Sequence, residues 1–285
     1  MADKRCLMVV HAHPDDEVFR TAGIYAKYAA AGAHVVAVYA TRGEEGEMHD
    51  PDLDPEEARV RLGEIREREV RAACAILGVK DVRFLGYRDS GMAGWDTNDN
   101  PAAFMNADVD EAAGQLLTII RETRPQVVVT YDERGDGGYG HPDHIMANSV
   151  TVAAFQRARG EPWAPEKLYY TASSRESFRH YVQTLRKYEL ELPWVREDFN
   201  FDEHGLPEAE ITARIDISGH VLLKKQALAA HRSQIPADFY YLAMPDEILL
   251  EASNVEHYMR ICPPPREGEH EDDLFAGIAV RSAVA

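Results

Sequence analysis

Short runs of apolar residues alternate with longer amphipathic stretches along the first 175 positions of the chain. Continuous apolar runs are typical of strands buried on both faces, whereas apolar residues that recur every three or four positions are typical of helices. The runs that predict strands are residues 6–10, 34–40, 82–85, 126–131 and 167–171. The stretches that predict helices are residues 18–31, ended by Gly32, residues 55–77, ended by Gly78, residues 109–123, and a segment after His144.

This alternation predicts an α/β fold of the Rossmann-like kind, in which a mostly parallel sheet carries helices on both faces. Beyond residue 175 the pattern loosens, and the elements it favours are fewer. They are helices over residues 178–190 and 219–233, and strands over residues 211–217 and 255–261.

We interpret residues 1–265 as a single domain, with a core over residues 1–175 and a smaller C-terminal elaboration over residues 176–265. Three prolines at 263–265 are followed by the acidic segment EGEHEDD. Such a composition favours solvent over a packed core, so we expect a loosely attached tail over residues 266–285.

Charge and apolar content limit the class of partner. The formal net charge of −18 argues against nucleic acid, because phosphate binding needs a basic surface. No apolar run approaches the length of about 18 residues that a membrane span needs, and the N-terminal segment MADKRCLMVV lacks a small-residue cleavage site. We therefore expect no membrane partner and a cytoplasmic location. The three widely spaced cysteines fit free thiols in a reducing compartment.

Polar and glycine-rich segments follow four consecutive predicted strands. They read HAHPDDE, TRGEEGE, GYRDSGM and DERGDGGYGHPDH in chain order. In a parallel sheet the ligand site lies beyond the carboxyl ends of the strands, in the loops that lead into helices. We therefore expect the functional site where these four loops meet.

The first of these loops carries residues that suit a metal ion. His13 and Asp16 are three positions apart near a helix start, so both can point to one place, while Asp15 is turned roughly 100° away and stays free to handle protons. The segment YGHPDH (139–144) repeats the combination and offers a third ligand. Two histidines and an aspartate suit Zn²⁺ with one open position, and Fe²⁺ also fits. A helix cap is the competing explanation for each residue alone.

The paired segments HAHPDDE and YGHPDH resemble the LmbE-like (PIG-L type) family of zinc-dependent N-deacetylases. The resemblance is close over roughly the first 155 residues and looser at HRSQ (231–234). Within this family, the chain is most similar to deacetylases of N-acetylglucosaminyl-inositol and to mycothiol S-conjugate amidases. The segments that extend the match are LGEIREREV (62–70), GYRDSGM (86–92), NADVDEAAGQL (106–116) and RPQVVVTYDE (124–133).

The resemblance implies a role for each matching residue. The zinc ligands would be His13, Asp16 and His144. The catalytic groups would be Asp15 as general base, His141 as the group that polarises the carbonyl or protonates the leaving amine, Tyr139 as the oxyanion stabiliser, and Asp143 as the residue that orients His141. The substrate contacts would be Arg66 and Asp89, which hold sugar hydroxyls, and Met92, which lines the same pocket.

Other substrate candidates come from the residues that differ from the family pattern. Arg20 stands where the mycothiol enzymes carry small or hydroxyl residues or a lysine, so it either lines the pocket mouth or points to solvent. The loop DERGDGGYG is about two residues longer than the common form. Among the glutamates of the second loop, Glu47 is the candidate that faces the sugar. A surface position for Arg66 and a simple turn role for Asp89 are the alternatives to sugar binding.

The expected function is zinc-dependent removal of the N-acetyl group from a small molecule that contains N-acetylglucosamine. The nearest alternative is a mycothiol S-conjugate amidase, and an alternative of another class is a non-catalytic protein that binds sugar or metal. A nucleotide-binding oxidoreductase is disfavoured because no G-x-G-x-x-G follows the first strand. A homo-oligomer is compatible with the sequence.

Overall fold

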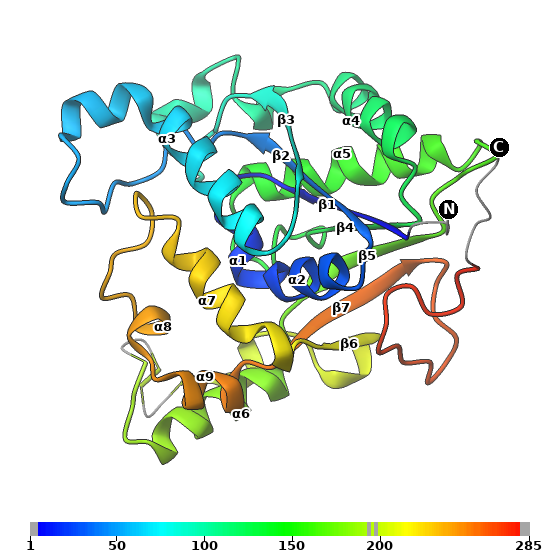
Figure 1. The fold of residues 1–285 in the computed structure, drawn as a ribbon. Coiled ribbons are helices and arrows are strands. Elements are labelled where there is room, and N and C mark those ends of the chain that lie inside the picture. Colours follow the sequence, from blue (N-terminus) through cyan, green and yellow to red (C-terminus); the bar gives the residue numbers. More distant parts are fainter. Residues whose placement is uncertain (1–4, 193–194, 197–198, 280–285) are drawn as a thin grey trace.

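The computed structural model describes residues 5–192, 195–196 and 199–279, and it contains a seven-stranded sheet (Figure 1). The strands are β1 (Cys6–His11), β2 (His34–Thr41), β3 (Asp81–Tyr87), β4 (Val127–Thr130), β5 (Lys167–Ala172), β6 (Ala213–Asp216) and β7 (Val255–Cys262). Their order is β3-β2-β1-β4-β5-β7-β6. Neighbours from β3 to β5 pair in parallel, and β7 pairs antiparallel with β5 and β6. The predicted α/β fold with a mostly parallel sheet is confirmed.

Strand β1 shows why the central strands are continuous apolar runs. Leu7 and Val9 project into a first hydrophobic cluster on one face of the sheet, whereas Cys6, Met8 and Val10 project into a second cluster on the other face. Side chains alternate along a strand, so a strand covered on both faces needs apolar residues at successive positions. Full burial of one such large side chain stabilises the fold by about 1.5–3 kcal/mol.

Helices cover both faces of the sheet (Figure 1). They are α1 (Asp16–Arg20), α2 (Ala22–Ala30), α3 (Pro55–Ile76), α4 (Val109–Thr123), α5 (Pro142–Ala158), α6 (Arg175–Lys187), α7 (Val221–Ala229), α8 (Tyr240–Ala243) and α9 (Asp246–Ala252). Helices α2, α3 and α7 pack in the first cluster, and α4 and α5 pack in the second. The C-terminal helices and strands predicted from sequence correspond to α6, α7, β6 and β7.

The helix predicted over residues 18–31 is two helices, which corrects that prediction. The break lies at Thr21, whose backbone leaves the helical region at φ −136°. Its hydroxyl lies 2.9 Å from Nε2 of the buried His11, so a tertiary contact at the end of β1 holds the break. The helix expected after His144 begins earlier, at Pro142, with His141 as its N-cap.

Part of the segment over residues 266–279 is buried against the first cluster, which corrects the expectation of a loosely attached tail. Leu274 and Phe275 are fully buried in the first cluster. The acidic composition pointed to solvent, but the carboxylate of Glu271 is buried and compensates buried cations. It accepts hydrogen bonds from Lys167, Tyr169 and Arg260. Residues 280–285 lie outside the described residues.

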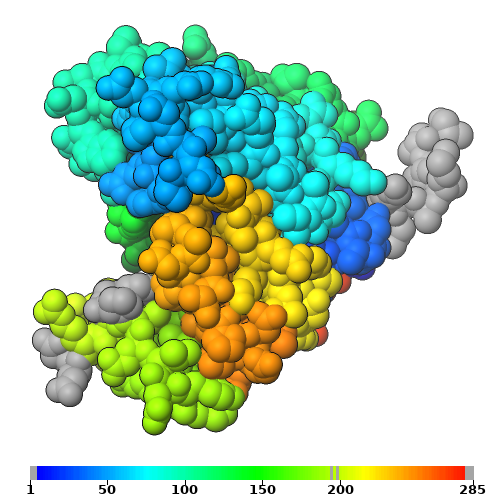
Figure 2. Space-filling view, turned by 60° about the vertical axis from the view of Figure 1, so that its left-hand side comes forward, coloured from blue at the N-terminus to red at the C-terminus, as the bar shows by residue number. Residues whose placement is uncertain are grey.

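The C-terminal elaboration lies beside the N-terminal half of the chain. In the space-filling view, the yellow and orange residues of α7, α8 and α9 lie directly below the blue and cyan residues that precede and form α3 (Figure 2). Helices α3 and α7 are in contact. Among the described helices, none has both the length and the apolar character that crossing a bilayer requires.

Candidate active site

The loops after β1 to β4 meet around a cavity of about 1160 Å³, at the edge of the sheet where the sequence predicts a site. Asp143 lies behind the wall of this cavity and is fully buried. The other predicted site residues line the cavity: His13, Asp15, Asp16, Arg20, Glu47, Arg66, Asp89, Met92, Tyr139, His141 and His144. Residues from the C-terminal elaboration form the opposite wall, including Phe178, Tyr181, Phe239 and Tyr241.

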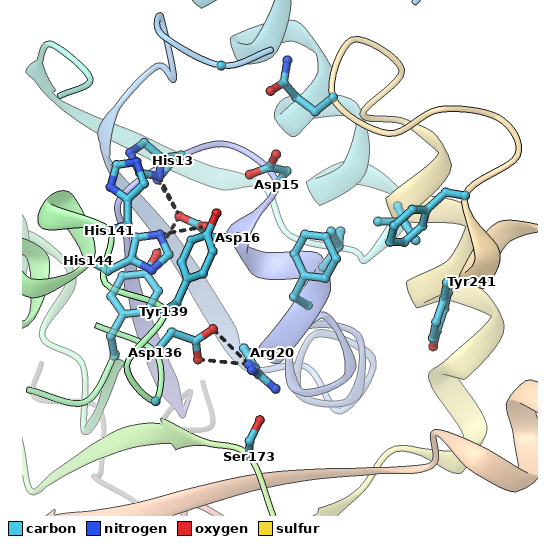
Figure 3. Close-up of a pocket in the computed structure, with 18 of the residues that line it drawn as sticks. His13, Asp15, Asp16, Arg20, Asp136, Tyr139, His141, His144, Ser173 and Tyr241 are labelled. Atoms are coloured by element: carbon cyan, nitrogen blue, oxygen red, sulfur yellow. Dashed lines mark hydrogen bonds and ion pairs between the residues drawn. The ribbon is translucent and has the colours of Figure 1, made fainter. Parts of the chain in front are cut away.

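The two H-P-D segments converge on one point (Figure 3). One ring nitrogen from each of His13, His141 and His144 lies within 4.8 Å of the others, and all three residues are buried. The ring centroid of His13 is 4.4 Å from that of His141 and 5.4 Å from that of His144. Side chains from distant parts of the chain are therefore close enough to share one cation.

Asp16 lies between His13 and His144, the other two predicted zinc ligands. Its Oδ1 is 3.2 Å from Nε2 of His144, and its Oδ2 is 3.5 Å from Nδ1 of His13. Tyr131 donates a hydrogen bond of 2.6 Å to Oδ2, and the backbone N–H of His13 donates one of 2.7 Å to the same atom. Burial favours the neutral acid, but His144 and His13 outweigh it and hold the pKa of Asp16 well below its usual value.

The carboxylate of Asp143 contacts His13, whereas the backbone N–H of Asp143 makes the contact with His141. Its Oδ2 is 3.2 Å from Nε2 of His13 and accepts a 2.9 Å hydrogen bond from the backbone N–H of Ser90. The hydroxyl of Ser90 donates to Oδ1. The link from Asp143 to His141 runs through the backbone instead, because the N–H of Asp143 donates to Nδ1 of His141 at 3.2 Å.

These donors fit a divalent cation. A histidine that binds metal through one ring nitrogen commonly gives the other to a carboxylate. The contact with Asp143 occupies Nε2 of His13, while Nδ1 faces Asp16. A second group of carboxylates, Asp89 and Asp143, also lies close to His13. The backbone N–H of Ser90 donates to Asp143, and those of Gly91 and Glu45 donate to Asp89. The carboxylate oxygens of Asp89 and Asp143 therefore already have partners.

His141 is held as a neutral imidazole. Burial and the neighbouring His13 and His144 lower the pKa of His141 to about 4. Because Nδ1 accepts the N–H of Asp143, the ring proton resides on Nε2. His141 can therefore donate a hydrogen bond from Nε2 at neutral pH.

Asp15 has an unusual backbone conformation beside the metal group. Its φ is 100°, a left-handed value that is uncommon for a residue other than glycine and that concentrates at functional sites. The backbone N–H of Asp15 donates to Oε2 of Glu17 at 3.1 Å, and Oδ2 lies 3.2 Å from Nη2 of Arg66. Burial raises the pKa of Asp15 to about 6, against the opposing effect of Arg66. A carboxyl group with that pKa is suited to accept and return a proton.

Arg66 is buried, so the surface alternative for it is wrong. Its guanidinium donates to the carbonyl of Gly43 at 2.8 Å and to that of Pro14 at 2.5 Å, which ties the first two loops together. Asp89 both stabilises the turn of its loop and contacts a histidine of the site. It accepts the N–H of Gly91 at 2.8 Å and lies 3.4 Å from Nε2 of His13.

The rim of the cavity carries the remaining candidates. Tyr139 is 61% exposed, and the centroid of its ring lies 5.7 Å from that of His144. Burial of part of the ring and the nearby Asp16 raise the pKa of Tyr139, which keeps its hydroxyl protonated. Glu47 is exposed at the rim, whereas Nε of Arg20 is bonded to Asp136 at 3.0 Å (Figure 3).

Sequence reasoning missed several residues of the site. Tyr131 ends an apolar strand and looks like a core residue, yet it supports Asp16 and stacks on His144 with 4.2 Å between ring centroids. Ser90 lies in the third loop, and apart from this position nothing in the sequence indicated that it belongs to the site. His231 lies in the loosely matching segment HRSQ, and its Nε2 lies 2.6 Å from Oε1 of the buried Glu17.

Sequence comparison relates the chain to deacetylases. The family described as PIG-L, GlcNAc-PI de-N-acetylase, matches residues 8–155. A protein of Thermobifida fusca (strain YX), described as 1D-myo-inositol 2-acetamido-2-deoxy-alpha-D-glucopyranoside deacetylase, is 44% identical over 292 residues. This match covers 97% of the chain and 100% of the relative.

Solved structures share the fold. N,N'-diacetylchitobiose deacetylase from Pyrococcus horikoshii has a TM-score of 0.59 and 20% identity, over 91% of this chain and 84% of that one. GalB, a 4-carboxy-2-hydroxymuconate hydratase from Pseudomonas putida KT2440, has a TM-score of 0.55 and 20% identity, over 92% and 98%. Since a deacetylase and a hydratase share this fold, the fold alone does not define the reaction. The sequence matches do define the family: the chain belongs to the GlcNAc-PI de-N-acetylase (PIG-L) family.

Proposed function

We propose that this chain hydrolyses the acetamide of an N-acetylglucosaminyl-inositol, releasing acetate and the free amine. Relatives described as deacetylases of 1D-myo-inositol 2-acetamido-2-deoxy-alpha-D-glucopyranoside match nearly its whole length, which supports this substrate class. The observation that carries the proposal is the convergence of His13, His141 and His144 within 4.8 Å, with Asp15 and Asp16 beside them.

The metal in this proposal is a divalent cation, preferably Zn²⁺, held by His13, Asp16 and His144. Nitrogen and carboxylate donors suit zinc, and a catalytic site with three protein ligands keeps one position open. When bound, the cation lowers the pKa of water and polarises a carbonyl oxygen. Asp143 and Ser90 would fix the ring of His13 so that Nδ1 faces the cation.

Asp15 is the proposed general base. Its carboxylate lines the cavity next to Asp16, and its pKa of about 6 leaves it ionised at neutral pH yet basic enough to accept a proton from the attacking water. Arg66 fixes the carboxylate by its 3.2 Å contact. The left-handed backbone sets the direction in which the side chain leaves the loop.

His141 and Tyr139 are the proposed donors to the carbonyl oxygen, where negative charge develops as water attacks. Neutral His141 can donate from Nε2, and the phenol of Tyr139 stays protonated. Removal of one donor of this kind typically lowers kcat by about 10²–10³-fold. The leaving amine also needs a proton, which Asp15 can return after it has accepted one from water.

The residues proposed to contact the sugar line the cavity. Arg66 and Asp89 lie in the deep wall and Met92 nearer the opening, and Glu47 is exposed at the rim. A disaccharide-like ligand presents many hydroxyl groups, and charged groups fixed by protein hydrogen bonds can bind them with little reordering.

The test is the release of free amine from N-acetylglucosaminyl-inositol by the purified metal-loaded enzyme, with a bimane-labelled mycothiol conjugate as the competing substrate. We expect free amine from the first and little cleavage of the second. Asp15→Asn is the matched control for contaminating activity. Preferential cleavage of the conjugate would instead support an S-conjugate amidase, and the absence of amine from both would refute hydrolysis of these amides.

A further inference from the structure

The 132–140 loop carries Tyr139 on a glycine-rich arm between β4 and α5. Gly135, Asp136, Gly137, Gly138 and Gly140 all have positive φ values, from 67° to 94°. Asp136 is the one residue among these five that is not a glycine, and an aspartate favours this conformation less than a glycine does. Unlike the glycines around it, Asp136 has a side chain that can make a contact of its own.

Asp136 has that contact across the cavity. Nε of Arg20, at the end of α1, donates to Oδ1 at 3.0 Å and to Oδ2 at 3.2 Å (Figure 3). Both residues line the cavity, and the side chains are 33% and 18% exposed. The two departures seen in the sequence, an arginine at position 20 and a longer loop, therefore meet in one ion pair.

The two sides of this pair differ in how firmly they are held. At the end of α1, the hydroxyl of the buried Tyr258 donates to the carbonyl of Arg20 at 2.9 Å, and Lys224 donates to that of Phe19 at 3.2 Å. The loop side is held at its base, where the N–H of Gly137 donates to Asp132 at 2.9 Å. The arm beyond that base is exposed.

We propose that the Arg20–Asp136 ion pair is a latch that fixes the 132–140 loop to the anchored end of α1 and so positions Tyr139 beside His141 and His144. Arg20 and Asp136 are positioning residues in this proposal, which rests on the proposed deacetylation for the role of Tyr139. Opening the latch frees the arm to carry the phenol away from the carbonyl oxygen. Its loss therefore lowers kcat more than it raises KM.

The first test measures hydrogen exchange of the amides of residues 132–141 in the intact protein, by mass spectrometry. A partly exposed ion pair is typically worth up to about 1 kcal/mol, which corresponds to about fivefold in the opening equilibrium. We expect two- to fivefold faster exchange, roughly, in Arg20→Ala and in Asp136→Asn. The double variant should exchange no faster than either. The matched controls are Arg121→Ala and Glu161→Gln, which break an ion pair away from the cavity.

The second test measures kcat and KM of the metal-loaded variants on N-acetylglucosaminyl-inositol. Both single variants should lower kcat by about two- to fivefold, and Asp136→Asn should have no further effect in a Tyr139→Phe background. Unchanged exchange in both variants would overturn the latch. A raised KM in Arg20→Ala without any effect of Asp136→Asn would also overturn it and assign Arg20 to the substrate. If the wild-type protein releases no amine, the proposed function fails, while the exchange measurement still decides whether the latch exists.

Discussion

Nε2 of His231 lies 2.6 Å from Oε1 of Glu17, and neither side chain is exposed to solvent. This pair joins the segment that follows α7 to the first helix of the chain. The other oxygen of Glu17 accepts the backbone N–H of Asp15. The C-terminal elaboration therefore supports the strained turn that carries the proposed base.

Loss of one member of this pair should destabilise the protein. His231→Ala leaves Glu17 as a buried carboxylate without its cation, so the free energy of unfolding should fall by about 3–5 kcal/mol. Urea titration followed by circular dichroism measures this change. Arg232→Ala is the matched control, because its side chain is 61% exposed and its loss should cost less than about 1 kcal/mol.

The same pair predicts a pH window. Despite burial, which acts the other way on each group, contact with Glu17 raises the pKa of His231 above 6.5, and contact with His231 lowers the pKa of Glu17 below 4.5. The stability from His231 is complete below pH 6.5 and declines above it, while that from Glu17 is complete above pH 4.5 and declines below it. The difference in unfolding free energy between wild type and His231→Ala should be largest between these values. A difference that rises steadily from pH 6.5 to 9 would contradict the ion pair.

Asp15 should govern the acid limb of the reaction. A base must be ionised to accept a proton, so kcat/KM should rise with pH through the pKa of Asp15, which is about 6 in the metal-free protein and lower once a cation is bound beside it. Asp15→Asn should lower kcat by orders of magnitude and keep the fold and the metal content, as measured by amine release, circular dichroism and elemental analysis. Residual activity with the same acid limb as the wild type would assign the limb to another group.

Asp15→Asn should also stabilise the metal-free protein. The raised pKa means that folding disfavours the ionised carboxylate, so this residue destabilises the native state increasingly as pH rises from 3.8 to about 6. Asparagine carries no charge and tolerates the left-handed backbone. We expect a gain of about 1–3 kcal/mol at pH 7 in urea unfolding. Asp99→Asn, at an exposed position, should change the stability little. A loss of stability would show that the contact with Arg66 outweighs the burial of the charge.

Ser90 should matter for metal affinity although it is not a proposed ligand. Ser90→Ala removes the hydroxyl that donates to Asp143, which in turn holds Nε2 of His13. Loss of such an outer partner typically weakens metal binding by about 10–100-fold. Competition with a zinc-binding dye measures the affinity. His144→Ala should abolish binding, and the exposed His180→Ala should leave it unchanged.

The sequence predicted most of the fold because burial on both faces of a parallel sheet demands apolar residues at successive positions. The central strands therefore appear as runs, and the position of the loops after them predicted where His13 and His144 would meet. The sequence could not predict the break between α1 and α2 at Thr21, because a contact with His11 of β1 holds that break. Periodicity reports which face of an element is buried and carries no information about such partners.

The sequence also could not predict the direction in which a polar side chain of the site points. The family resemblance assigned Asp143 to His141, but its carboxylate turns to His13, and Ser90 donates to both of its oxygens. Tyr131 was counted with the apolar strand because an aromatic residue fits a buried strand on propensity alone. Its hydroxyl can donate to Asp16 only because β1 and β4 are neighbours in the sheet.

The segment predicted as a tail should contribute to stability. Phe275 is fully buried, and its ring packs edge-on against Tyr28 of α2 at 5.2 Å between centroids. Removing a buried aromatic ring leaves a cavity and typically costs about 3–5 kcal/mol. Phe275→Ala should therefore lower the urea midpoint markedly, whereas the exposed Asp272→Ala nearby should not. Equal midpoints for the two variants would mean that residues 266–279 detach in solution, as the acidic composition of this segment first suggested.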